Sequence, residues 1–450
     1  MSIRQLLLSG TGLALGVLGA AGWTPVLAQH GASPTPSPTS TPPERRALGT
    51  ALGTTLGTAL SLPAVLQAAR QNPDALAAQR ALEAARADVR AADRAPAPVF
   101  STGVSSIELR HGNGGGSFWT QKRLDKSLGL DWTWERGNKR GLRTEVAERA
   151  ERAALADRRD TEVLQQIGAL SAFYELLAAQ ERLQELAALA ESARTLARTG
   201  ELRLRAGDIS AQDAARSRIE AERAQSELAL AQLAHQQAMQ ALATWTGQPV
   251  PAGGWRAEGA WPVAGAGAST TDVEALLEQR PDVLAARERV AAAEAALQGA
   301  QALRQADPTL GATFDHFPDG EKTNRLLAVR LSIPLNSAGR FDGEIGRAQA
   351  QLALAQDLLD KTRLQARAEL LTLLQAWRSQ SERLQAYEQR ILPQARQVAA
   401  QAELAYSKGG LSLTDLLDAR RTLRATQLET TGVRNEHARA LGAWQLRTAP

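Results

Sequence analysis

Two short regions of the chain alternate apolar residues with polar ones. In the first region, one set of alternate positions is mostly apolar and the set between them is polar or small: Leu124, Lys126, Leu128, Leu130, Trp132 and Trp134 alternate with Ser127, Gly129, Asp131, Thr133 and Glu135. The second region repeats the pattern at 310–315 and 327–336. A period of two predicts strands with one apolar face.

Each of these regions is expected to form one hairpin. Turn-rich segments at 111–117 and 318–323 separate the strands, so the hairpins span about 98–135 and about 308–336. The strand expected at about 98–110 alternates less cleanly than the other three.

Most of the remaining sequence has helical periodicity. Amphipathic helices are expected at about 61–95 and about 271–307, and each stops at a proline, Pro96 or Pro308, that cannot continue a helix.

Two much longer helices are expected at about 142–205 and about 343–408, where Pro393 should introduce a kink. At about 1.5 Å per residue, each would extend close to ~100 Å. The first carries apolar residues at coiled-coil spacing: Val163, Ile167, Leu170, Tyr174 and Leu177, then Leu183, Leu186, Ala190, Ala193 and Ala197. Alanine in such a seam lets helix backbones approach closely.

The two halves of the chain repeat each other. One set of residues recurs at a constant offset: Gln71, Pro73, Asp74, Leu76, Ala77 and Ala78 correspond to Gln279, Pro281, Asp282, Leu284, Ala285 and Ala286. A second set does the same near the ends of the long helices: Glu201, Leu202, Gly207, Ser210, Asp213 and Arg218 correspond to Glu403, Leu404, Gly409, Ser412, Asp415 and Arg420. The duplication predicts a first repeat at 60–247, a Gly/Pro/Trp-rich connector at 248–269 and a second repeat at 270–447.

The N-terminus has the features of a secretory signal peptide. Arg4 precedes an apolar stretch, and Val26-Leu27-Ala28 fits a signal peptidase site, so residues 1–28 are expected to be removed. The alternative is a membrane anchor, but the stretch is short and is interrupted by Gly and Thr. Residues 29–59, rich in Pro, Ser and Thr, are expected to be a linker.

Composition excludes several kinds of site. The chain has no cysteine, which removes disulfides, thiolate metal sites and a lipid-accepting Cys. The five histidines are scattered singly, so neither a metal site nor a catalytic constellation is expected, and no cofactor: His30, His111, His235, His316 and His437. The net charge of +4 is spread over interleaved basic and acidic residues, which does not favour a nucleic-acid partner.

The strand pattern alone fits either a half-buried soluble sheet or a membrane barrel. Three observations favour the barrel. The helices have their own seams to fill, an exported chain without a spanning helix crosses a bilayer only as a closed barrel, and Trp119, Trp132 and Trp134 fit an interfacial aromatic belt. Four strands cannot close alone, whereas twelve strands from three chains leave a lumen. The expected fold is therefore mainly α with a membrane β-barrel.

Each long helix is expected to end in a tight helical hairpin, because Gly207 and Gly409 precede Ser210 and Ser412 in capping positions. The segment 406–421, with sequence YSKGGLSLTDLLDARR, resembles the hairpin-tip signature of TolC-type outer-membrane factors. The resemblance covers both repeats. It implies a homotrimer in which four strands per subunit form a shared twelve-stranded barrel, continued by a coiled-coil α-helical barrel across the periplasm. Residues 135–140, with sequence ERGNKR, further resemble the branch paired with heavy-metal resistance-nodulation-division pumps.

The resemblance also implies roles for residues at the tips. Tyr406, Asp415 and Asp418 match family residues joined by polar contacts at the periplasmic aperture, although Leu411 stands where the best-known member has an arginine. The alternative is a capped helix start with solvated acids. The implied surface for the periplasmic adaptor consists of residues at both tips: Gly207, Ser210, Gly409, Gly410, Leu411 and Ser412.

The first copy of the tip differs at one of these positions. Asp415 has a counterpart in Asp213, but Asp418 aligns with Arg216, so the two copies are not equivalent at the aperture.

The function expected from these features is that of a passive outer-membrane duct. It would extend into the periplasm of a Gram-negative-type cell, contact outer-membrane lipid, and receive energy from an inner-membrane resistance-nodulation-division pump through the adaptor. Its cargo would be heavy-metal cations or drugs. The alternatives are a periplasmic coiled-coil adaptor or scaffold without a pore and, least favoured by the residues, an enzyme.

Overall fold

The computed structural model describes residues 57–119, 123–265, 272–319, 322–335 and 339–449. The expected signal peptide and nearly all of the expected linker lie outside the described residues. Among the residues that are described, no helix combines the length and the apolar character needed to cross a membrane.

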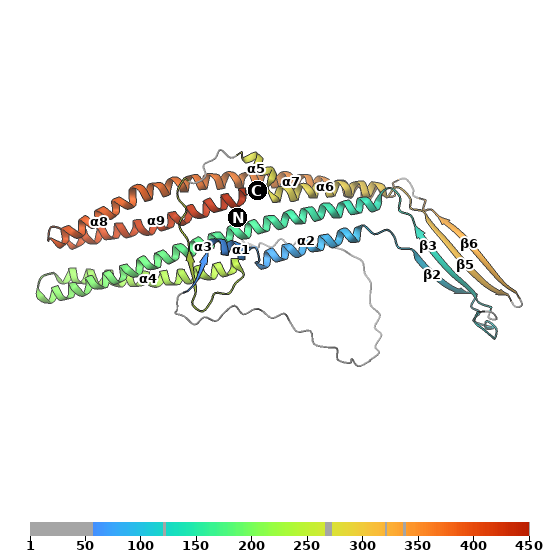
Figure 1. The fold of residues 1–450 in the computed structure, drawn as a ribbon, viewed down its shortest axis with the longest axis horizontal. Coiled ribbons are helices and arrows are strands. Elements are labelled where there is room, and N and C mark those ends of the chain that lie inside the picture. Colours follow the sequence, from blue (N-terminus) through green and yellow to red (C-terminus); the bar gives the residue numbers. More distant parts are fainter. Residues whose placement is uncertain (1–56, 120–122, 266–271, 320–321, 336–338, 450) are drawn as a thin grey trace, which may run out of the picture. The chain divides into compact units, whose positions relative to one another are not determined.

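The two long helices predicted from the sequence are present, and each is followed by a helix that folds back on it (Figure 1). In the first repeat, α3 (Lys139–Ala206) packs along α4 (Ala211–Thr246). In the second repeat, α7 (Asp342–Ala386), a π-helical turn (Tyr387–Ile391) and α8 (Leu392–Ser407) form one long rod, and α9 (Leu413–Thr448) packs against it.

The predicted interruption near Pro393 takes the form of this π turn. Proline lacks an N–H, and its ring displaces the carbonyl four residues earlier, which is Gln389 here. The helical hydrogen-bond ladder therefore shifts over 387–391 and resumes with Pro393 in the first turn of α8.

The coiled-coil seam of α3 is also confirmed. Leu186, Ala190, Ala193 and Ala197 are all buried, and the small side chains of Ala190 and Ala193 pack against Ala224 of α4. The alanines thus bring the two helix backbones close together, as the sequence suggested.

The prediction of one helix at 61–95 and one at 271–307 is wrong, because each is divided in two. The observed pairs are α1 (Leu62–Ala69) with α2 (Pro73–Ala92), and α5 (Val273–Gln279) with α6 (Pro281–Ala302). A proline disfavours the helical conformation in the residue before it. Accordingly Asn72 (ψ 153°) and Arg280 (ψ 137°) are extended, and both breaks fall at the same place in the duplication.

The connector contains a strand that the sequence analysis did not predict. β4 (Trp255–Glu258) pairs in parallel with β1 (Thr58–Ser61), a second strand that the sequence did not predict. On its other edge, the main-chain N–H and C=O of Ala257 bond to the side-chain amide of Gln180 on α3, at 2.7 and 3.2 Å. The connector is therefore attached to the first long helix by both strand pairing and a side-chain amide.

The two predicted hairpins form one antiparallel sheet in the order β2-β3-β5-β6. The strands are β2 (Val99–Ser105), β3 (Asp125–Thr133), β5 (Thr309–Asp319) and β6 (Lys322–Ser332). The first strand is shorter than the predicted 98–110, and its loop is longer. Ser106 has a positive φ of 58°, and Asn113 bonds to the chain on both sides of the loop, at Ser106 and Arg123. These bonds stabilise the loop without strand pairing.

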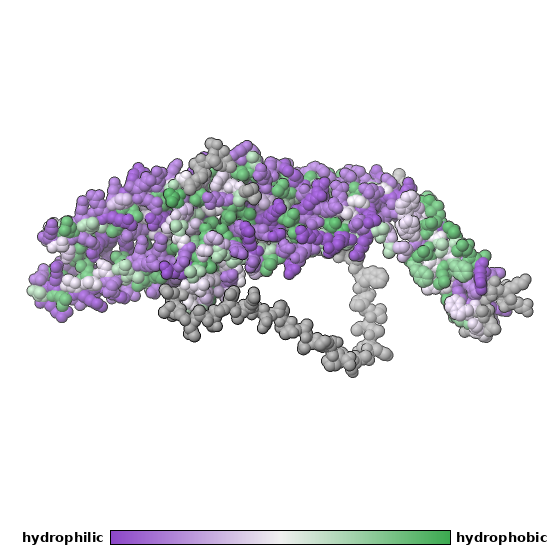
Figure 2. All heavy atoms as spheres, in the orientation of Figure 1, coloured by the Kyte–Doolittle hydropathy of each residue, from purple (hydrophilic) through white to green (hydrophobic). Residues whose placement is uncertain are grey.

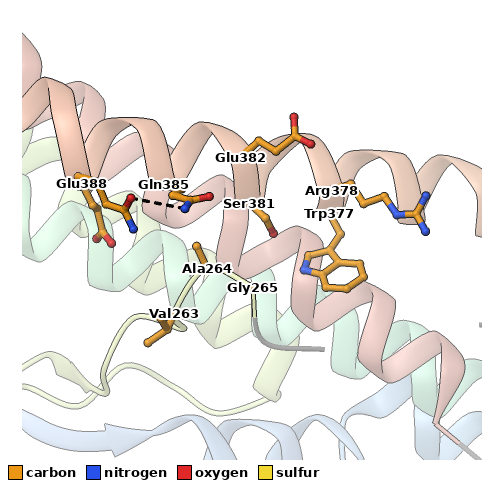
Figure 3. A pocket seen from close by; sticks show the side chains of 10 residues that line it. Val263, Ala264, Gly265, Trp377, Arg378, Ser381, Glu382, Gln385 and Glu388 are labelled. Atoms are coloured by element: carbon orange, nitrogen blue, oxygen red, sulfur yellow. Dashed lines mark hydrogen bonds between the residues drawn. The ribbon is translucent and has the colours of Figure 1, made fainter. Parts of the chain in front are cut away.

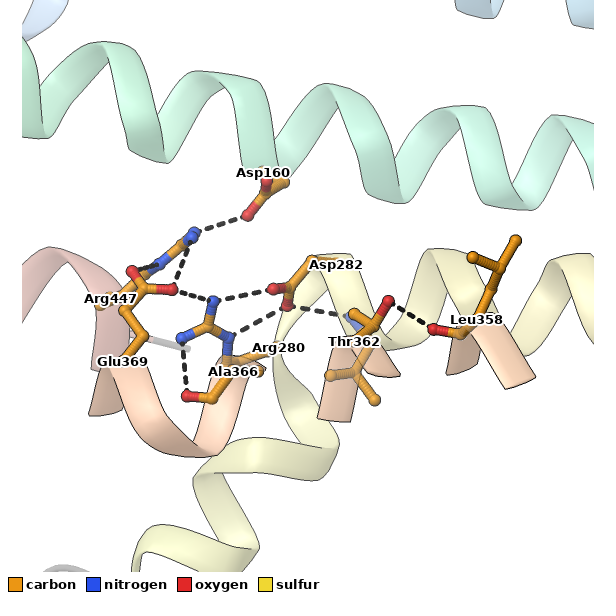
Figure 4. A network of polar contacts seen from close by, with 9 residues as sticks. Asp160, Arg280, Asp282, Leu358, Thr362, Ala366, Glu369 and Arg447 are labelled. Atoms are coloured by element: carbon orange, nitrogen blue, oxygen red, sulfur yellow. Dashed lines mark hydrogen bonds and ion pairs between the residues drawn. The ribbon is translucent and has the colours of Figure 1, made fainter. Parts of the chain in front are cut away.

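The second repeat is joined to the first by a buried cluster of charges (Figure 4). Arg280, only 2% exposed, donates to Asp282 at 2.8 Å and to Glu369 of α7 at 2.7 Å. Arg447 of α9 donates to Glu369 at 3.0 Å and to Asp160 of α3 at 2.5 Å. The cluster thus connects helices of the second repeat with the long helix of the first.

The equivalent place in the first repeat contains amides. Asn72 precedes Pro73 as Arg280 precedes Pro281. Its side-chain oxygen accepts from the N–H of Asp74 at 2.6 Å, which caps α2, and its nitrogen donates to Gln165 of α3 at 2.9 Å. The same backbone turn is therefore stabilised by an asparagine–glutamine pair in one repeat and by an arginine–glutamate ion pair in the other.

Candidate functional site

The sheet has one apolar face, and that face is exposed. Strand register places three apolar rows across it, which comprise Phe100–Leu130–Ala312–Val329, Thr102–Leu128–Phe314–Leu327 and Trp132–Leu310–Leu331. Leu327 and Val329 are 75% and 72% exposed. Figure 2 shows hydrophobic residues gathered over the strands, while hydrophilic residues cover most of the helical surface. A contiguous apolar surface of this kind marks a membrane or protein contact.

The opposite face of the sheet is polar. Arg330 of β6 reaches across β5 to Asp131 of β3 and forms an ion pair of 2.7 Å. A β-carbon on the intervening Gly311 would collide with the Asp131 carboxylate, so the glycine makes room for this bridge. The hydroxyls of Thr133 and Thr309 form a further cross-strand hydrogen bond of 2.9 Å. The alternation predicted from sequence therefore separates an apolar face from a hydrogen-bonded one.

The three tryptophans proposed for a membrane interface lie at two different levels of the sheet. Trp132 and Trp134 lie at the end of β3 that leads into α3, and their side chains are 52% and 64% exposed. Trp119 lies in the loop at the other end of the hairpin and is 64% exposed. Aromatic residues therefore lie at both ends of the apolar face.

A sharp turn joins the sheet to the long helix. Gly137 (φ 73°) and Asn138 (φ 54°) are both left-handed, which redirects the chain from β3 into α3. Lys139 holds the turn by donating to Asp307 and to the Gln305 carbonyl, both at 2.6 Å. The segment 135–140 thus serves as the corner between strand and helix.

The two helical hairpin tips have the same local structure. Gly207 (φ 81°) and Gly409 (φ 74°) take left-handed conformations at the ends of α3 and α8. Ser210 and Ser412 then cap α4 and α9 by accepting from main-chain N–H groups three residues later, at 3.1 and 3.2 Å. Gly410 and the half-buried Leu411 complete the second turn. Both tips are compact and exposed.

The structure does not bring Tyr406, Asp415 and Asp418 together within one chain. The Asp415 carboxylate accepts from the Ser412 hydroxyl at 2.7 Å, as its counterpart Asp213 does from Ser210. The Asp415 side chain therefore takes part in the cap of α9. Asp418 remains 64% exposed and lies 3.5 Å from Arg421.

Arginines that the sequence analysis did not select link the two tips. Arg203 donates to the Tyr406 hydroxyl at 3.5 Å, and Arg216 donates to Thr414 at 3.0 Å. Arg421 forms an ion pair of 2.8 Å with Glu220. The Leu411 position lacks an arginine, but Tyr406 and Asp418 each have an arginine partner from another position. In the sequence, the alignment of Asp418 with Arg216 already indicated that the two tips carry opposite charges at this equivalent position.

A cavity of about 510 Å³ lies beside the π turn of the second repeat (Figure 3). It is bounded by the connector at Val263 and Ala264 and by Trp377, Ser381 and Glu388. The Trp377 indole nitrogen and the Ser381 hydroxyl are buried there without a hydrogen-bond partner among the described residues. Across all the residues that the structure describes, no group of three or more His, Cys, Asp or Glu side chains is positioned to hold a metal ion.

Known proteins share this arrangement. A family model described as Outer membrane efflux protein matches residues 64–248 and 273–445. The cobalt-zinc-cadmium resistance protein CzcC of Cupriavidus metallidurans is 29% identical over 299 residues, covering 66% of this chain and 71% of the relative. The pyoverdine export outer membrane protein OpmQ of Pseudomonas aeruginosa is 30% identical over 292 residues, covering 61% of this chain and 59% of the relative.

The fold is also that of a solved channel. CusC, whose crystal structures describe folding and transmembrane channel formation, superposes with a TM-score of 0.70 at 18% identity, covering 86% of this chain and 91% of CusC. Mainly helical subunits with a helical barrel and a β-barrel domain are the shared architecture. The chain belongs to the outer membrane efflux protein family, and it is an outer-membrane channel subunit of a tripartite efflux system that extends into the periplasm.

Proposed function

We propose that three copies of this chain close one twelve-stranded β-barrel and that their helical hairpins continue it as a passive duct. The observation that carries the proposal is the exposed apolar face of a sheet in which β2 and β6 have a strand neighbour on one side only, within the described residues. In a bilayer such edges must be paired. Two copies would give eight strands, whose interior side chains fill, whereas twelve strands leave a lumen.

The test of the duct is electrical. The purified full-length chain, inserted into planar bilayers, should give discrete single-channel currents. A periplasmic scaffold without a pore would give none, and it would wash off membranes without detergent. The chain performs no catalysis in this proposal, so the energy for export comes from its inner-membrane partner.

We propose that Asp418 contributes to the periplasmic aperture and that Asp415 acts mainly as a helix cap. Three copies of an exposed acid around one axis favour cations and repel anions. The Asp418→Ala variant should therefore raise single-channel conductance and weaken cation selectivity. Unchanged conductance would exclude Asp418 from the aperture.

A matched control is available on α7. Asp360 is an exposed acid with an arginine three residues later, Arg363, at 3.9 Å, as Asp418 has Arg421. The Asp360→Ala variant removes the same charge and the same kind of pair away from the tips, so its conductance should equal that of the wild-type chain.

We propose that the hairpin tips receive a periplasmic adaptor and, through it, a resistance-nodulation-division pump. The tips are exposed and held by glycine turns and serine caps, which favours a preformed docking surface. The Gly409→Val variant places a β-branched residue at φ 74° and should distort the tip and reduce capture of a purified adaptor. The Gly114→Val variant, at φ 78° in the strand loop, should leave capture unchanged.

We propose heavy-metal cations as the cargo, with drugs or other small molecules as the second candidate. The support is the similarity to CzcC, a cobalt-zinc-cadmium resistance protein, whereas OpmQ exports pyoverdine. Deletion of the gene should sensitise cells to divalent transition metals. Sensitivity to drugs or detergents alone would favour the second candidate.

A further inference from the structure

The apolar face of the sheet ends in a row of basic side chains near the strand loops. Strand register aligns Lys126 of β3 with His316 of β5 and Arg325 of β6. We call these three residues the basic row. Two residues further along each strand, the same face carries Leu128, Phe314 and Leu327. The basic row therefore directly borders the apolar surface.

The acidic residues next in sequence point away from this face. Asp125 and Asp315 precede Lys126 and His316 by one position, and successive strand residues point to opposite faces of a sheet. Basic side chains are thus concentrated on the apolar side, where the adjoining row that the structure describes, with Leu128, Phe314 and Leu327, carries no carboxylate.

Two aromatic residues of the first strand loop lie at the level of the basic row. The Lys126 ammonium lies 4.9 Å from the centroid of the Phe118 ring. The His316 Nε2 atom lies 2.8 Å from the Trp119 carbonyl oxygen, and the Phe118 and Trp119 rings are edge to face at 5.3 Å. Aromatic rings and cations at one level are typical of the boundary between hydrocarbon and lipid headgroups.

The members of the basic row differ in accessibility. Lys126 is 6% exposed and donates to the Leu124 carbonyl at 3.2 Å, so it orders the loop. Arg325 is exposed and forms no ion pair with any residue that the structure describes. His316 is half-buried, and one of its ring nitrogens is already engaged by the Trp119 carbonyl. Arg325 is thus the main group open to an external anion, with His316 beside it.

The position of the basic row fits the outer side of the membrane. Lys126 and Trp134 are eight residues apart on one strand, which corresponds to about 26 Å along the strand at ~3.3 Å per residue. At a barrel strand tilt of ~35–45°, this length covers about 20 Å of an apolar band about 25 Å tall, so the two levels lie within a few Å of opposite interfaces. Because Trp134 lies beside the helix that enters the periplasm, the basic row lies at the opposite, outer interface.

We propose that the basic row binds the phosphate groups of an anionic lipid headgroup in the outer leaflet. An arginine fork matches a phosphate in geometry and charge. The neighbouring leucine and phenylalanine side chains would contact the acyl chains of the same lipid. This inference rests on the outer-membrane barrel and is independent of the helical aperture.

The test uses the full-length protein in detergent, with lipid binding measured by native mass spectrometry. The probes are a bis-phosphorylated lipid A, the same lipid with its phosphates removed, and inorganic phosphate. The wild-type chain should bind the phosphorylated lipid at least tenfold more tightly than the dephosphorylated lipid. The His316→Gln/Arg325→Gln variant should lose that preference, and Arg325→Gln alone should lose most of it.

The matched control removes an arginine of the same strand from the opposite face. The Arg330→Gln/Asp131→Asn variant replaces the ion pair of the polar face by amides and should bind the phosphorylated lipid within twofold of the wild type. Equal binding of both lipids, an equal loss in the control variant, or equally tight binding of inorganic phosphate would overturn the proposal. Single-channel currents should persist in every variant, so a failure here is distinct from a failure of the duct.

Discussion

The two repeats contain the same helix break but stabilise it with different side chains. Each breaks its first helix before a proline, and the residue at the break bonds to the long helix beside it. In the first repeat, Asn72 and Gln165 share a neutral hydrogen bond of 2.9 Å. In the second, Arg280 and Glu369 form an ion pair of 2.7 Å. Both repeats therefore have the same backbone turn, but the side chains that connect it to the long helix differ.

The difference has consequences for what each junction connects. Asn72 caps α2 and donates hydrogen bonds to Gln165 of α3 and to the Trp245 carbonyl of α4, and these three bonds all lie within the first repeat. The ionic junction continues through Arg447 to Asp160 and so connects the second repeat to the first. Breaking a buried ion pair lowers the free energy of unfolding strongly, because the remaining charge is left without a partner. Loss of a hydrogen bond between neutral amide side chains lowers it much less.

The largest effect is expected at Arg280. The Arg280→Met variant leaves Asp282 and Glu369 without this partner and should lower the free energy of unfolding by about 3–5 kcal/mol. The Asn72→Ala variant at the equivalent position should cost less, ~2–3 kcal/mol, through loss of the cap and of the hydrogen bonds to Gln165 and to the Trp245 carbonyl. Denaturant unfolding in detergent, followed by helical circular dichroism, measures both. Equal losses would mean that the two junctions contribute alike.

A smaller effect is expected from copying the amide chemistry into the second repeat. The Arg280→Asn variant should be destabilised, because Asp282 loses its arginine and Glu369 keeps only Arg447 as a partner. Adding Glu369→Gln, which reproduces the Asn72 and Gln165 pair, should recover about 1 kcal/mol, as coupled neighbours do in double-mutant cycles. If the effects of the two substitutions on the free energy of unfolding are simply additive, an amide pair does not replace the ion pair at this junction.

The smallest effect concerns pH. Burial would raise the pKa of Glu369, but its hydrogen bonds and attraction to Arg447 and Arg280 outweigh burial and lower that pKa. Burial likewise opposes a lowered pKa at Asp282, and the bonds to Arg280 prevail. A carboxylate with a lowered folded-state pKa contributes stability above its unfolded pKa of about 4 and loses it as pH falls through the folded value.

Asp160 acts in the opposite direction. Burial raises its pKa more than Arg447 lowers it, so its charge costs stability at neutral pH, and that cost is relieved on acidification. At neutral pH, the free energy of unfolding of Glu369→Gln should be about 1 kcal/mol below that of the wild type, because this side chain is partly exposed. This difference should narrow below pH ~4. The gap between the wild type and Asn72→Ala should stay constant over the same range. A constant gap for both variants would contradict the assignment of charge to the second junction.

Long regular patterns were predictable from the sequence. Alternation over five or six positions identified β3, β5 and β6, and heptad spacing identified α3 because both patterns extend far beyond chance length. The same reasoning missed the breaks at Pro73 and Pro281, since apolar periodicity continues on both sides of each proline. It also missed β1 and β4, because four-residue strands that pair across about two hundred residues leave no local pattern.

The tip residues show the same limit. The cap formed by Ser412 and Asp415 follows a spacing that is readable in the sequence, where a cap was the alternative to an aperture role for Asp415. The contacts of Arg203, Arg216 and Arg421 depend on how the two helical hairpins pack, and no local pattern records that. Sequence therefore located the tips but not the groups that join them.

The central claim is that neighbouring copies pair β6 of one chain with β2 of the next. The chain contains no cysteine, so Ser101→Cys in β2 can be combined with single cysteines at 326, 328 or 330 in β6. Within one chain these strands are three spacings apart, about 14 Å at ~4.8 Å per strand, which exceeds the reach of a disulfide. Mild oxidation in membranes should give covalent dimers and trimers, and no larger species, for at least one pair. Monomers alone for all three pairs would contradict the shared barrel.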